Sequence, residues 1–449
     1  MEFGNEPLCA RNFETGYNKV SRFSEPPSCT LQGAPLGSAA STSTLKSSEM
    51  RALLLVLDQL GVGLAPDTNC PPPPDTLGHL LDEVPDLELP TLFSLGLGEI
   101  MKGRVFDPPA RDCTASYGRM IQRSAGTDPL SGLWELAGVV LGCPFTAGTQ
   151  LPNEFIATLA RECGVEFLVH RSNNAPQLQA TARLEELHKE HLQTGCPILT
   201  LAADSTLLIT AHESKIPAAR LTQICRIARI QCDNWRISRV TGQLMAGKPG
   251  AWKQTGSAFN FFMVPPRTLL NALSEKGFPV EAVGAVNDAF ARSGVTNTYP
   301  TASRTETLRV IEKLWRSPQN GMIFANLGHF VSHSGCGVGH ATALECARAL
   351  REFDHWLGRF LEEIESDNLL IITGANRGDP TSFDPASPRQ EVPVLVRYGG
   401  RTAPLGVRET FADVAATLGA FFGIDEDGRP WTIGESLITF HRPRGFDGP

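Results

Sequence analysis

The sequence predicts an α/β protein: a mostly parallel sheet flanked by helices, with a smaller α/β insert. Three observations lead to this class. Short apolar runs alternate with amphipathic helical segments, and the first run, RALLLVL, is apolar at nearly every position, as in a strand buried on both faces. The chain has 449 residues, more than the roughly 250–300 at which a single core stops growing. Residues 146–265 also carry strand-like and helical runs of their own.

The first 49 residues differ from the rest of the chain. They include APLGSAASTSTLKSS, lack the apolar centre of a signal peptide and show no helical or strand period. We therefore expect residues 1–49 to be a disordered leader, or an upstream extension before a natural start at Met50, and to lie outside the fold.

Composition excludes several classes of partner. The formal net charge is -8, the pI is near 5.7 and no basic block occurs, so neither nucleic acid nor an anionic membrane surface is expected to bind. No apolar run approaches the ~18 residues of a membrane-spanning helix. The 11 cysteines are odd in number and form no repeated CxxC pair, which favours free thiols in a cytoplasmic protein.

The predicted core comprises residues 50–145 and 266–449. Its first strand ends at Asp58, and ligands of open α/β sheets bind beyond such carboxyl ends. The runs MIFANL, LLIITG and VPVLVRYG are expected to be strands. ATALECARALREFDHWLGRFLEEIE is expected to form a long amphipathic helix, and TFADVAATLGAFFG a last helix with a glycine stop.

Residues 124–142 read as a loop that enters a helix. Asp128 is a good N-cap, and Pro129 occupies the first helical position, where its missing N–H costs nothing. The N-terminus of this helix is expected to offer its dipole to an anion. Within the helix, Trp134 is expected to pack in the core and Glu135 to face solvent.

The insert, residues 146–265, is predicted to be a smaller α/β cap. It contains strand-like PILTLAADSTLLITA and helical LTQICRIARI, and His212 is expected to make a structural hydrogen bond. Its aromatic side chains either line an apolar cleft or belong to the core, which is their commoner place. They are Trp252, Phe259, Phe261 and Phe262.

One glycine-rich loop, GHFVSHSGCGVGH, gathers potential metal ligands. Imidazole and thiolate are the ligands that zinc prefers, although the spacing H-x3-H-x2-C-x3-H matches no established zinc motif. The alternative is a loop with exposed histidines, the last of which caps the following helix. The residues concerned are His329, His333, Cys336 and His340.

A series of motifs in one order gives the sequence a family resemblance. It begins with VLDQLGVGLAPD around Asp58 and continues through DTLGH, LGLG, AGTDPLSGLWELAG, DSTLLITAHE, ETLRVIEKL, LLIITG, GDP, VPVLV and RETFADVAATL. The series resembles the phosphopentomutases, members of the alkaline phosphatase superfamily that have an α/β core and an inserted cap. The resemblance covers nearly all of residues 51–437.

The resemblance implies a metalloenzyme that interconverts ribose 1-phosphate and ribose 5-phosphate. In that family two divalent ions, usually manganese, lie at the carboxyl edge of the sheet. A threonine at a helix N-terminus carries the phosphoryl group. Paired metals suit this chemistry because they clamp the attacking and leaving oxygens of an in-line transfer.

Several family positions carry a different residue in this sequence. Asp58 matches the first metal ligand, but the phosphorylated threonine falls on Pro129, which has no hydroxyl. Thr127 and Ser131 lie nearby as alternative nucleophiles, but neither occupies the matching position. We therefore expect the two-manganese site to be lost, and a zinc site in the His/Cys loop, near Asp58, to be the alternative. The other metal-ligand positions fall on Val331, Cys336, Ala375, Asn376 and, approximately, Ser387.

The cap differs in the same way. Where the resemblance implies a basic segment that grips the sugar phosphate, this sequence reads QTGSAFNFF, with Gln254 and Ala258, and Ala285 replaces a lysine. Arginine would bind phosphate through two parallel hydrogen bonds, which neither residue can do. The catalytic and substrate-binding residues stay open, the latter placed in the inherited cleft near Gln254 and Phe261.

Three functions are therefore compatible with the sequence. The first is a pseudoenzyme that binds a small molecule or a protein partner through the inherited cleft. The second is an enzyme of isomerase ancestry with new chemistry, acting on a sugar- or nucleoside-derived substrate in a specialised biosynthetic pathway. The third is a residual phosphopentomutase with displaced ligands. Fold alone does not choose among them.

Overall fold

The computed structural model describes most of the chain from Met50 to Phe440. The described residues are 50–58, 60–66, 74–101, 112–126, 128–146, 151–170, 177–202, 204–249, 251–317, 320–328, 340–375, 389–424 and 432–440. At Pro129, 177–182 and 340–342 only the backbone is described. The predicted leader, residues 1–49, lies outside the described residues.

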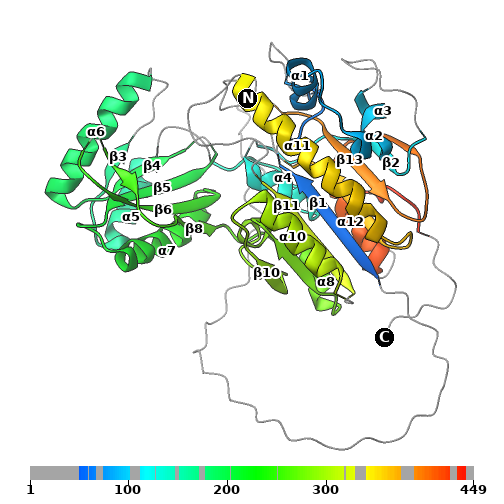
Figure 1. The fold of residues 1–449 in the computed structure, drawn as a ribbon. Coiled ribbons are helices and arrows are strands. Elements are labelled where there is room, and N and C mark those ends of the chain that lie inside the picture. The colour runs from blue at the N-terminus through cyan, green and yellow to red at the C-terminus, as the bar shows by residue number, and fades with distance from the viewer. Residues whose placement is uncertain are drawn as a thin grey trace, which may run out of the picture. The chain divides into compact units, whose positions relative to one another are not determined.

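Eight strands form a large mixed sheet. They are β1 (Arg51–Leu57), β2 (Ser116–Met120), β9 (Val280–Val283), β10 (Asn297–Tyr299), β11 (Gly321–Leu327), β12 (Leu369–Thr373), β13 (Val392–Arg397) and β14 (Pro404–Arg408). Their order is β10-β9-β11-β1-β12-β13-β2-β14 (Figure 1). The strands from β10 to β12 run parallel, and only β13 is antiparallel to its neighbours. The predicted mostly parallel sheet is confirmed.

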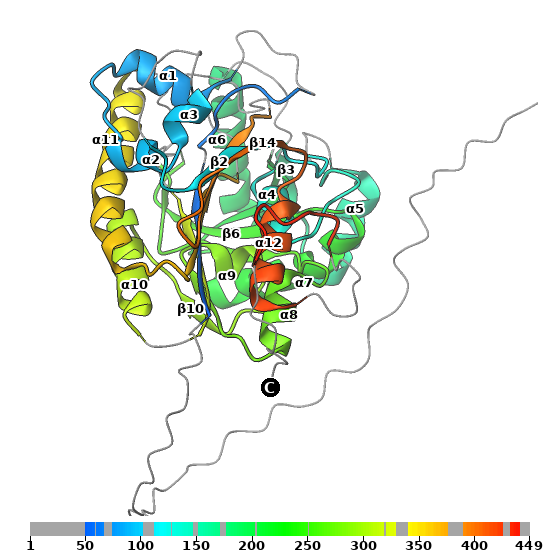
Figure 2. The same cartoon turned by 90° about the vertical axis from the view of Figure 1, so that its right-hand side faces the viewer.

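β1 is buried on both faces because its side chains alternate between two hydrophobic cores. Leu53 and Leu55 point into one core, and Leu54 and Val56 point into the other. Burial of each such leucine contributes roughly 1.5–3 kcal/mol. The first core is covered by α1 (Thr76–Glu83), α2 (Pro90–Ser94), α3 (Leu97–Met101), α10 (Arg304–Trp315) and α11 (His340–Phe360). The second is covered by α4 (Pro129–Leu136), α8 (Leu269–Glu275), α9 (Val286–Ala289) and α12 (Ala412–Phe422), so helices flank both faces (Figure 2).

The two long C-terminal helices begin and end near the predicted places. α11 ends at Phe360 and continues as a short 3-10 turn at Leu361–Glu363, slightly before the predicted end. α12 ends at Gly423, whose φ of 67° is the left-handed conformation that glycine adopts without strain. The glycine stop read from the sequence is confirmed.

A second, six-stranded sheet has its own hydrophobic core. Its strands are β3 (Leu168–His170), β4 (Ile198–Leu201), β5 (Thr206–His212), β6 (Arg239–Ala246), β7 (Lys253–Gln254) and β8 (Phe259–Phe262). The order is β3-β4-β5-β6-β7, and β8 pairs with β6. Helices α5 (Asn153–Cys163) and α7 (Ala218–Asn234) supply apolar side chains to its core, and α6 (Gln177–Thr194) contacts β3, β4 and β5. These elements fall inside residues 146–265, but a separate cap with those boundaries stays a prediction.

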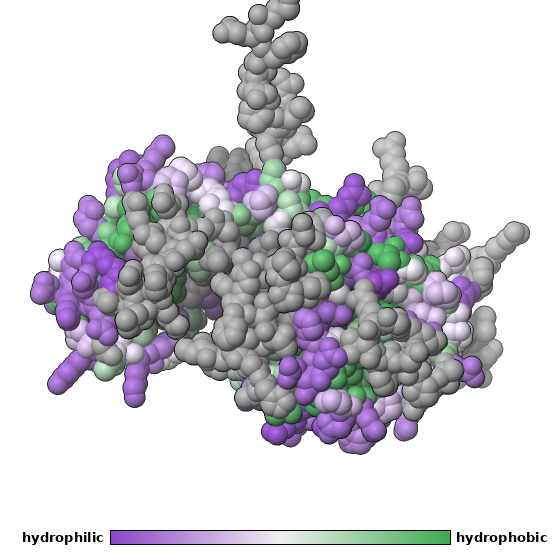
Figure 3. All heavy atoms as spheres, turned by 90° about the horizontal axis from the view of Figure 1, so that it is seen from above, coloured by the Kyte–Doolittle hydropathy of each residue, from purple (hydrophilic) through white to green (hydrophobic). Residues whose placement is uncertain are grey.

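The described surface is mixed in polarity, with hydrophilic side chains interleaved among hydrophobic ones in the view of Figure 3. Within the described ranges, each helix is too short or too polar to cross a lipid bilayer. The large apolar side chains most exposed there belong to different segments: Ile230, Val264, Leu344, Val407 and Ile433.

Candidate functional site

The carboxyl ends of three adjacent parallel strands define the candidate site. The register of β1 with β11 sets Leu57 opposite Leu327, and that of β1 with β12 sets Val56 opposite Thr373. Asp58 follows β1 directly, and its amide donates to the carbonyl oxygen of Leu327 at 3.3 Å. The half-buried Asp58 therefore stands at the edge where open α/β sheets bind their ligands.

Ala375 reaches the same edge from β12. It lies two residues beyond Thr373, and only 2% of it is exposed. A Cβ atom on Gly374 would lie 2.6 Å from the carbonyl oxygen of Leu60, so glycine at this position lets the chain beyond β12 approach the loop beyond β1. The methyl group of Ala375 offers neither a lone pair to a cation nor a donor to a phosphate.

The N-terminus of α4 is occupied by a side chain of its own. Asp128 caps the helix, and its Oδ1 accepts from the amides of Leu130 and Ser131, both at 2.9 Å. Pro129 is the first residue of the helix, as predicted. The Asp128 carboxyl thus already accepts from the amides that an outside anion would bind, and anion binding at this end stays a prediction.

Only one of the two carboxyl oxygens of Asp128 accepts hydrogen bonds from the described residues. Its Oδ2 is buried and has no hydrogen-bond partner among the described residues. Burial raises the pKa of this carboxyl above its usual value, although the hydrogen bonds from Ser131 and Leu130 oppose the shift. The protonated form is thus favoured more than for an exposed aspartate.

The hydroxyl of Ser131 both donates and accepts a hydrogen bond. It donates to the carbonyl oxygen of Asp128 at 3.0 Å and accepts from Nε2 of Gln122 at 2.9 Å, in a side chain with no exposed surface. Arg389 holds the same loop from the other side by donating to the carbonyl oxygens of Gln122 and Ser124. Ser131 therefore has a structural role, which disfavours it as a substitute nucleophile.

Glu135 is buried, so its predicted exposure is wrong. Its Oε1 accepts from the Arg123 amide at 2.8 Å, the Thr410 hydroxyl at 2.8 Å and the Phe411 amide at 2.9 Å. Its Oε2 accepts from the Ser124 amide at 2.5 Å. The carboxylate thus joins the loop before α4 to the segment before α12. The packing role expected for Trp134 is confirmed, because this residue is 1% exposed.

Gln390 ties the loop beyond β1 to the segment before β13. Its Oε1 accepts from the Thr76 amide at 3.0 Å, and its Nε2 donates to the Thr76 hydroxyl at 3.0 Å. A Cβ atom on Gly61 would lie 1.9 Å from Gln390 Oε1, so this contact needs a glycine. The loops of the edge are held by polar side chains that the sequence did not single out.

Comparison with known proteins places the chain in a family. Residues 270–426 match the model of the Metalloenzyme superfamily, a stretch that includes β11, β12 and β13. A phosphopentomutase of Syntrophotalea carbinolica is 35% identical over 382 residues, which cover 84% of this chain and 95% of the relative. The chain belongs to the phosphopentomutase family. The predicted alkaline-phosphatase-like α/β class is confirmed with it.

Other relatives and structures are similar at different levels. The phosphopentomutase of Acetivibrio thermocellus is 34% identical over 388 residues, covering 84% of this chain and 97% of that one. A solved structure of a phosphoglycerate mutase from Leishmania mexicana is 12% identical, with a TM-score of 0.45, over 88% of this chain and 99% of that chain.

Most of the predicted metal positions lie outside the described residues. This holds for His329, His333 and Cys336 of the glycine-rich loop and for the positions Val331, Asn376 and Ser387. His340 is the first residue of α11, but its side chain is not described. Within the described part of the chain, no group of three or more His, Cys, Asp or Glu side chains is arranged to hold a metal. The zinc alternative stays a prediction.

Gln254 and Phe261, the two positions expected to lie near the ligand, differ in their surroundings. Gln254 of β7 is exposed, and its Nε2 donates to the carbonyl oxygen of Gly256 at 3.2 Å. Phe261 of β8 is half-buried and packs, like Phe259, on the core of the six-stranded sheet. Gln254 is thus accessible to a ligand, whereas the Phe261 ring contributes to packing.

Trp252 does not join these phenylalanines. Its ring stacks on His188 with centroids 3.7 Å apart and lies near His191 and His212. His212 makes the expected structural hydrogen bond, from Nε2 to the carbonyl oxygen of Gly247 at 3.0 Å. The sequence predicts Trp252 to lie in an apolar cleft or in the core, whereas the structure places it among three histidines.

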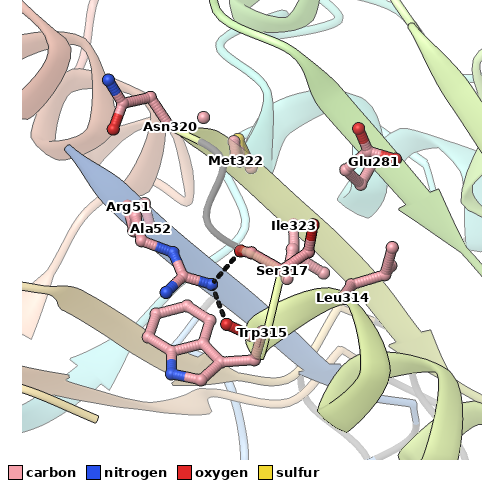
Figure 4. A pocket seen from close by; sticks show the side chains of 10 residues that line it. Arg51, Ala52, Glu281, Leu314, Trp315, Ser317, Asn320, Met322 and Ile323 are labelled. Atoms are coloured by element: carbon pink, nitrogen blue, oxygen red, sulfur yellow. Dashed lines mark hydrogen bonds between the residues drawn. The ribbon is translucent and has the colours of Figure 1, made fainter. Parts of the chain in front are cut away.

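A small pocket lies at the amino ends of the same sheet strands. The Arg51 guanidinium donates to the carbonyl oxygens of Trp315 and Ser317, and its Cζ lies 4.4 Å from the centre of the Trp315 ring (Figure 4). Glu281 and Asn320 also line the pocket. Its volume of about 30 Å³ holds one or two water molecules, which is too little for a sugar phosphate.

Proposed function

We propose that this member of the phosphopentomutase family has lost the interconversion of ribose 1-phosphate and ribose 5-phosphate and now binds a ligand through the inherited carboxyl edge. The observation that carries the proposal is that Asp58 and the buried Ala375 follow the ends of β1 and β12, where Val56 pairs with Thr373. One carboxylate and one buried methyl group stand at this edge where the resemblance implies two metal-ligating side chains.

The two divalent ions of the family do not fit the residues at this edge. Hard cations require several oxygen ligands, and Ala375 supplies none. The proposed function therefore includes no reaction step on a metal pair.

Among the described residues, the N-terminus of helix α4 offers no free hydroxyl to carry a phosphoryl group, and Thr127 lies outside them. Pro129 has no hydroxyl, and the Ser131 hydroxyl donates to Asp128 and accepts from Gln122. The Asp128 carboxyl occupies the helix N-terminus that would otherwise attract a phosphate. A covalent phosphoenzyme at this helix is thus disfavoured on three separate grounds.

Retained mutase activity is the competing function, because relatives named phosphopentomutases are about 35% identical over most of the chain. The repurposed enzyme with a rebuilt His/Cys metal site depends on the loop around His333 and Cys336. These alternatives predict turnover or bound zinc, respectively, and the proposed pseudoenzyme predicts neither.

The test is a coupled assay for ribose 1-phosphate conversion in the presence of Mn²⁺, with the Syntrophotalea carbinolica phosphopentomutase as positive control. We expect no turnover above the buffer rate, and none from Pro129→Thr, which restores the hydroxyl but not the ligands. Turnover that is abolished in Asp58→Asn would contradict the proposal. A thermal-shift titration with ribose 5-phosphate then measures whether the edge still binds a sugar phosphate.

A further inference from the structure

Four histidines and a tryptophan lie close together where α6 contacts the six-stranded sheet. His188 and His191 lie one turn apart on α6 and therefore share a face of the helix. The Trp252 ring stacks on His188, with an interplanar angle of 12°, and meets His191 edge-on with centroids 5.7 Å apart. His212, at the end of β5, lies 5.3 Å from the same ring. The fourth, His170, ends β3, and its Nδ1 lies 3.5 Å from the Thr200 hydroxyl.

The hydrogen bonds of His191 require a neutral ring. Its Nδ1 lies 2.7 Å from the carbonyl oxygen of Cys196 and must donate to it, because a carbonyl only accepts. Its Nε2 accepts from the amide of His212 at 2.9 Å. A second proton on Nε2 would face that amide N–H, so protonation breaks the bond between α6 and β5.

His188 and Trp252 each bury an unused nitrogen. Nδ1 of His188 and Nε1 of Trp252 have no hydrogen-bond partner among the described residues, and His188 is only 8% exposed. A charge on His188 would therefore be desolvated with no described acceptor at Nδ1. The burial of the stacked pair therefore favours the neutral imidazole.

The charges around the cluster also oppose protonation. Arg183 acts on His170, and Lys215 and His212 act on His191; Glu185 alone favours the charged form of His188. Lys248 and Lys253, on either side of the turn that carries Trp252, are exposed. Burial is the largest cause that lowers the pKa of His170, His188 and His191.

The segment that Trp252 anchors has few other attachments. β7 follows Trp252 directly and pairs with β6 only through Met245 with Gln254 and Ala246 with Lys253. Both β7 residues are exposed. The turn before it needs Gly247, because a Cβ there would lie 2.6 Å from the carbonyl oxygen of Ala251. Segments held by so few contacts open at low free-energy cost.

We propose that the imidazoles of His188 and His191, packed against Trp252, form an acid-sensitive latch that holds the β6–β7 turn and β7 on α6 and releases them at mildly acidic pH. Release places Trp252 and the exposed Gln254 in solvent and lets both histidines take up protons. The latch is built entirely from the six-stranded sheet and does not depend on the proposed loss of mutase chemistry.

Hydrogen exchange of the full chain, followed by mass spectrometry at pH 7.5, 6.5 and 5.5 and corrected for intrinsic rates, tests the latch. Each proton taken up on release raises the opening constant about tenfold per pH unit once the pH is below ~6.5. Because two histidines take up protons, we expect protection of residues 247–254 to fall by roughly 10- to 100-fold between pH 6.5 and 5.5. Unchanged protection there would overturn the proposal.

Two variants separate the latch from general acid sensitivity. His188→Phe keeps a stacked ring without a titrating group, and His191→Gln keeps one donor and one acceptor for Cys196 and His212. The double variant is expected to lose the acid response of residues 247–254, whereas His355→Gln, at an exposed position of α11, is expected to keep it. A double variant that opens in acid like the wild type would refute the latch. The wild-type profile alone decides if the variants do not fold.

Discussion

The carboxyl edge of the eight-stranded sheet and the histidine cluster of the six-stranded sheet use buried polar side chains in opposite ways. At the edge, Asp128 and Glu135 accept backbone hydrogen bonds and thereby fix loops. In the cluster, His188 and Trp252 pack ring on ring, and each leaves a buried nitrogen without a described partner. The first arrangement satisfies its buried carboxylates with hydrogen bonds, whereas the second contains imidazoles, the side chains whose unperturbed pKa lies closest to neutrality.

The comparison also explains how chemistry can be lost without loss of the fold. The side chains that hold the edge together are Asp128, Glu135 and Gln390, and none of them coincides with Pro129 or Ala375. Substitutions at the positions that carry chemistry in the family therefore leave the hydrogen bonds of the scaffold intact.

The largest effect is expected when the edge loses Glu135. Glu135→Ala leaves three buried donors, the Ser124 amide, the Thr410 hydroxyl and the Phe411 amide, without their acceptor. The part-buried Arg123 amide loses its acceptor as well. Because each unsatisfied buried donor costs about 1–3 kcal/mol, the free energy of unfolding should fall by about 3 kcal/mol or more. Urea denaturation measures this, with Glu88→Ala, at an exposed site, as a control. Equal effects of the two substitutions would show that Glu135 does not hold the edge.

The next effect concerns the cluster. The pKa of His188 and of His191 is lower in the folded protein than in the unfolded chain, so the unfolded chain binds their protons first as the pH falls. Stability from these groups is complete above ~6.5 and declines below it by about 1.4 kcal/mol per pH unit for each proton. Denaturation midpoints at pH 7.5, 6.5 and 5.5 should decline less in the His188→Phe/His191→Gln variant. Equal declines of the wild type and the variant would show that His188 and His191 do not cause the loss of stability in acid.

A smaller effect is expected at Asp128. Asp128→Ala removes the N-cap of α4 and should lower the free energy of unfolding by about 1 kcal/mol. Asp128→Asn keeps the acceptor and should be close to the wild type at pH 7. Since burial raises the pKa of Asp128, the wild type loses stability as the pH rises through that pKa, and the asparagine variant avoids this loss. Thermal denaturation at pH 4 and pH 7 measures the effect of each substitution and its pH dependence. An asparagine variant as unstable as the alanine variant would contradict the N-cap role of Asp128.

Local patterns in the sequence account for much of the fold. The apolar run of β1 predicts a strand buried on both faces, and Gly423 predicts the end of α12, because each depends on neighbouring residues alone. Glu135 could not be placed in this way, since its partners Thr410 and Phe411 lie 275 and 276 residues away along the chain. The stacking of Trp252 on His188 could not be predicted for the same reason, because the two residues lie far apart in the sequence and form no spacing pattern.

The sequence predicts less of the candidate site than of the fold. The place of Asp58 follows from the end of an apolar strand, and that of Ala375 from the parallel register. The glycine-rich loop was singled out by residue type and spacing, which carry no information on whether its side chains converge. His333 and Cys336 lie outside the described residues, so that hypothesis depends on chemistry rather than on geometry.

Metal content of the untagged protein, purified without chelator and measured by mass spectrometry, tests the central claim most directly. Loss of the family's two-ion site predicts no stoichiometric manganese, in the wild type and in a His333→Ala/Cys336→Ala variant alike. About one equivalent of zinc that the double variant loses would instead establish a rebuilt metal site and overturn the pseudoenzyme. Two equivalents of manganese that Asp58→Asn loses would contradict the account altogether.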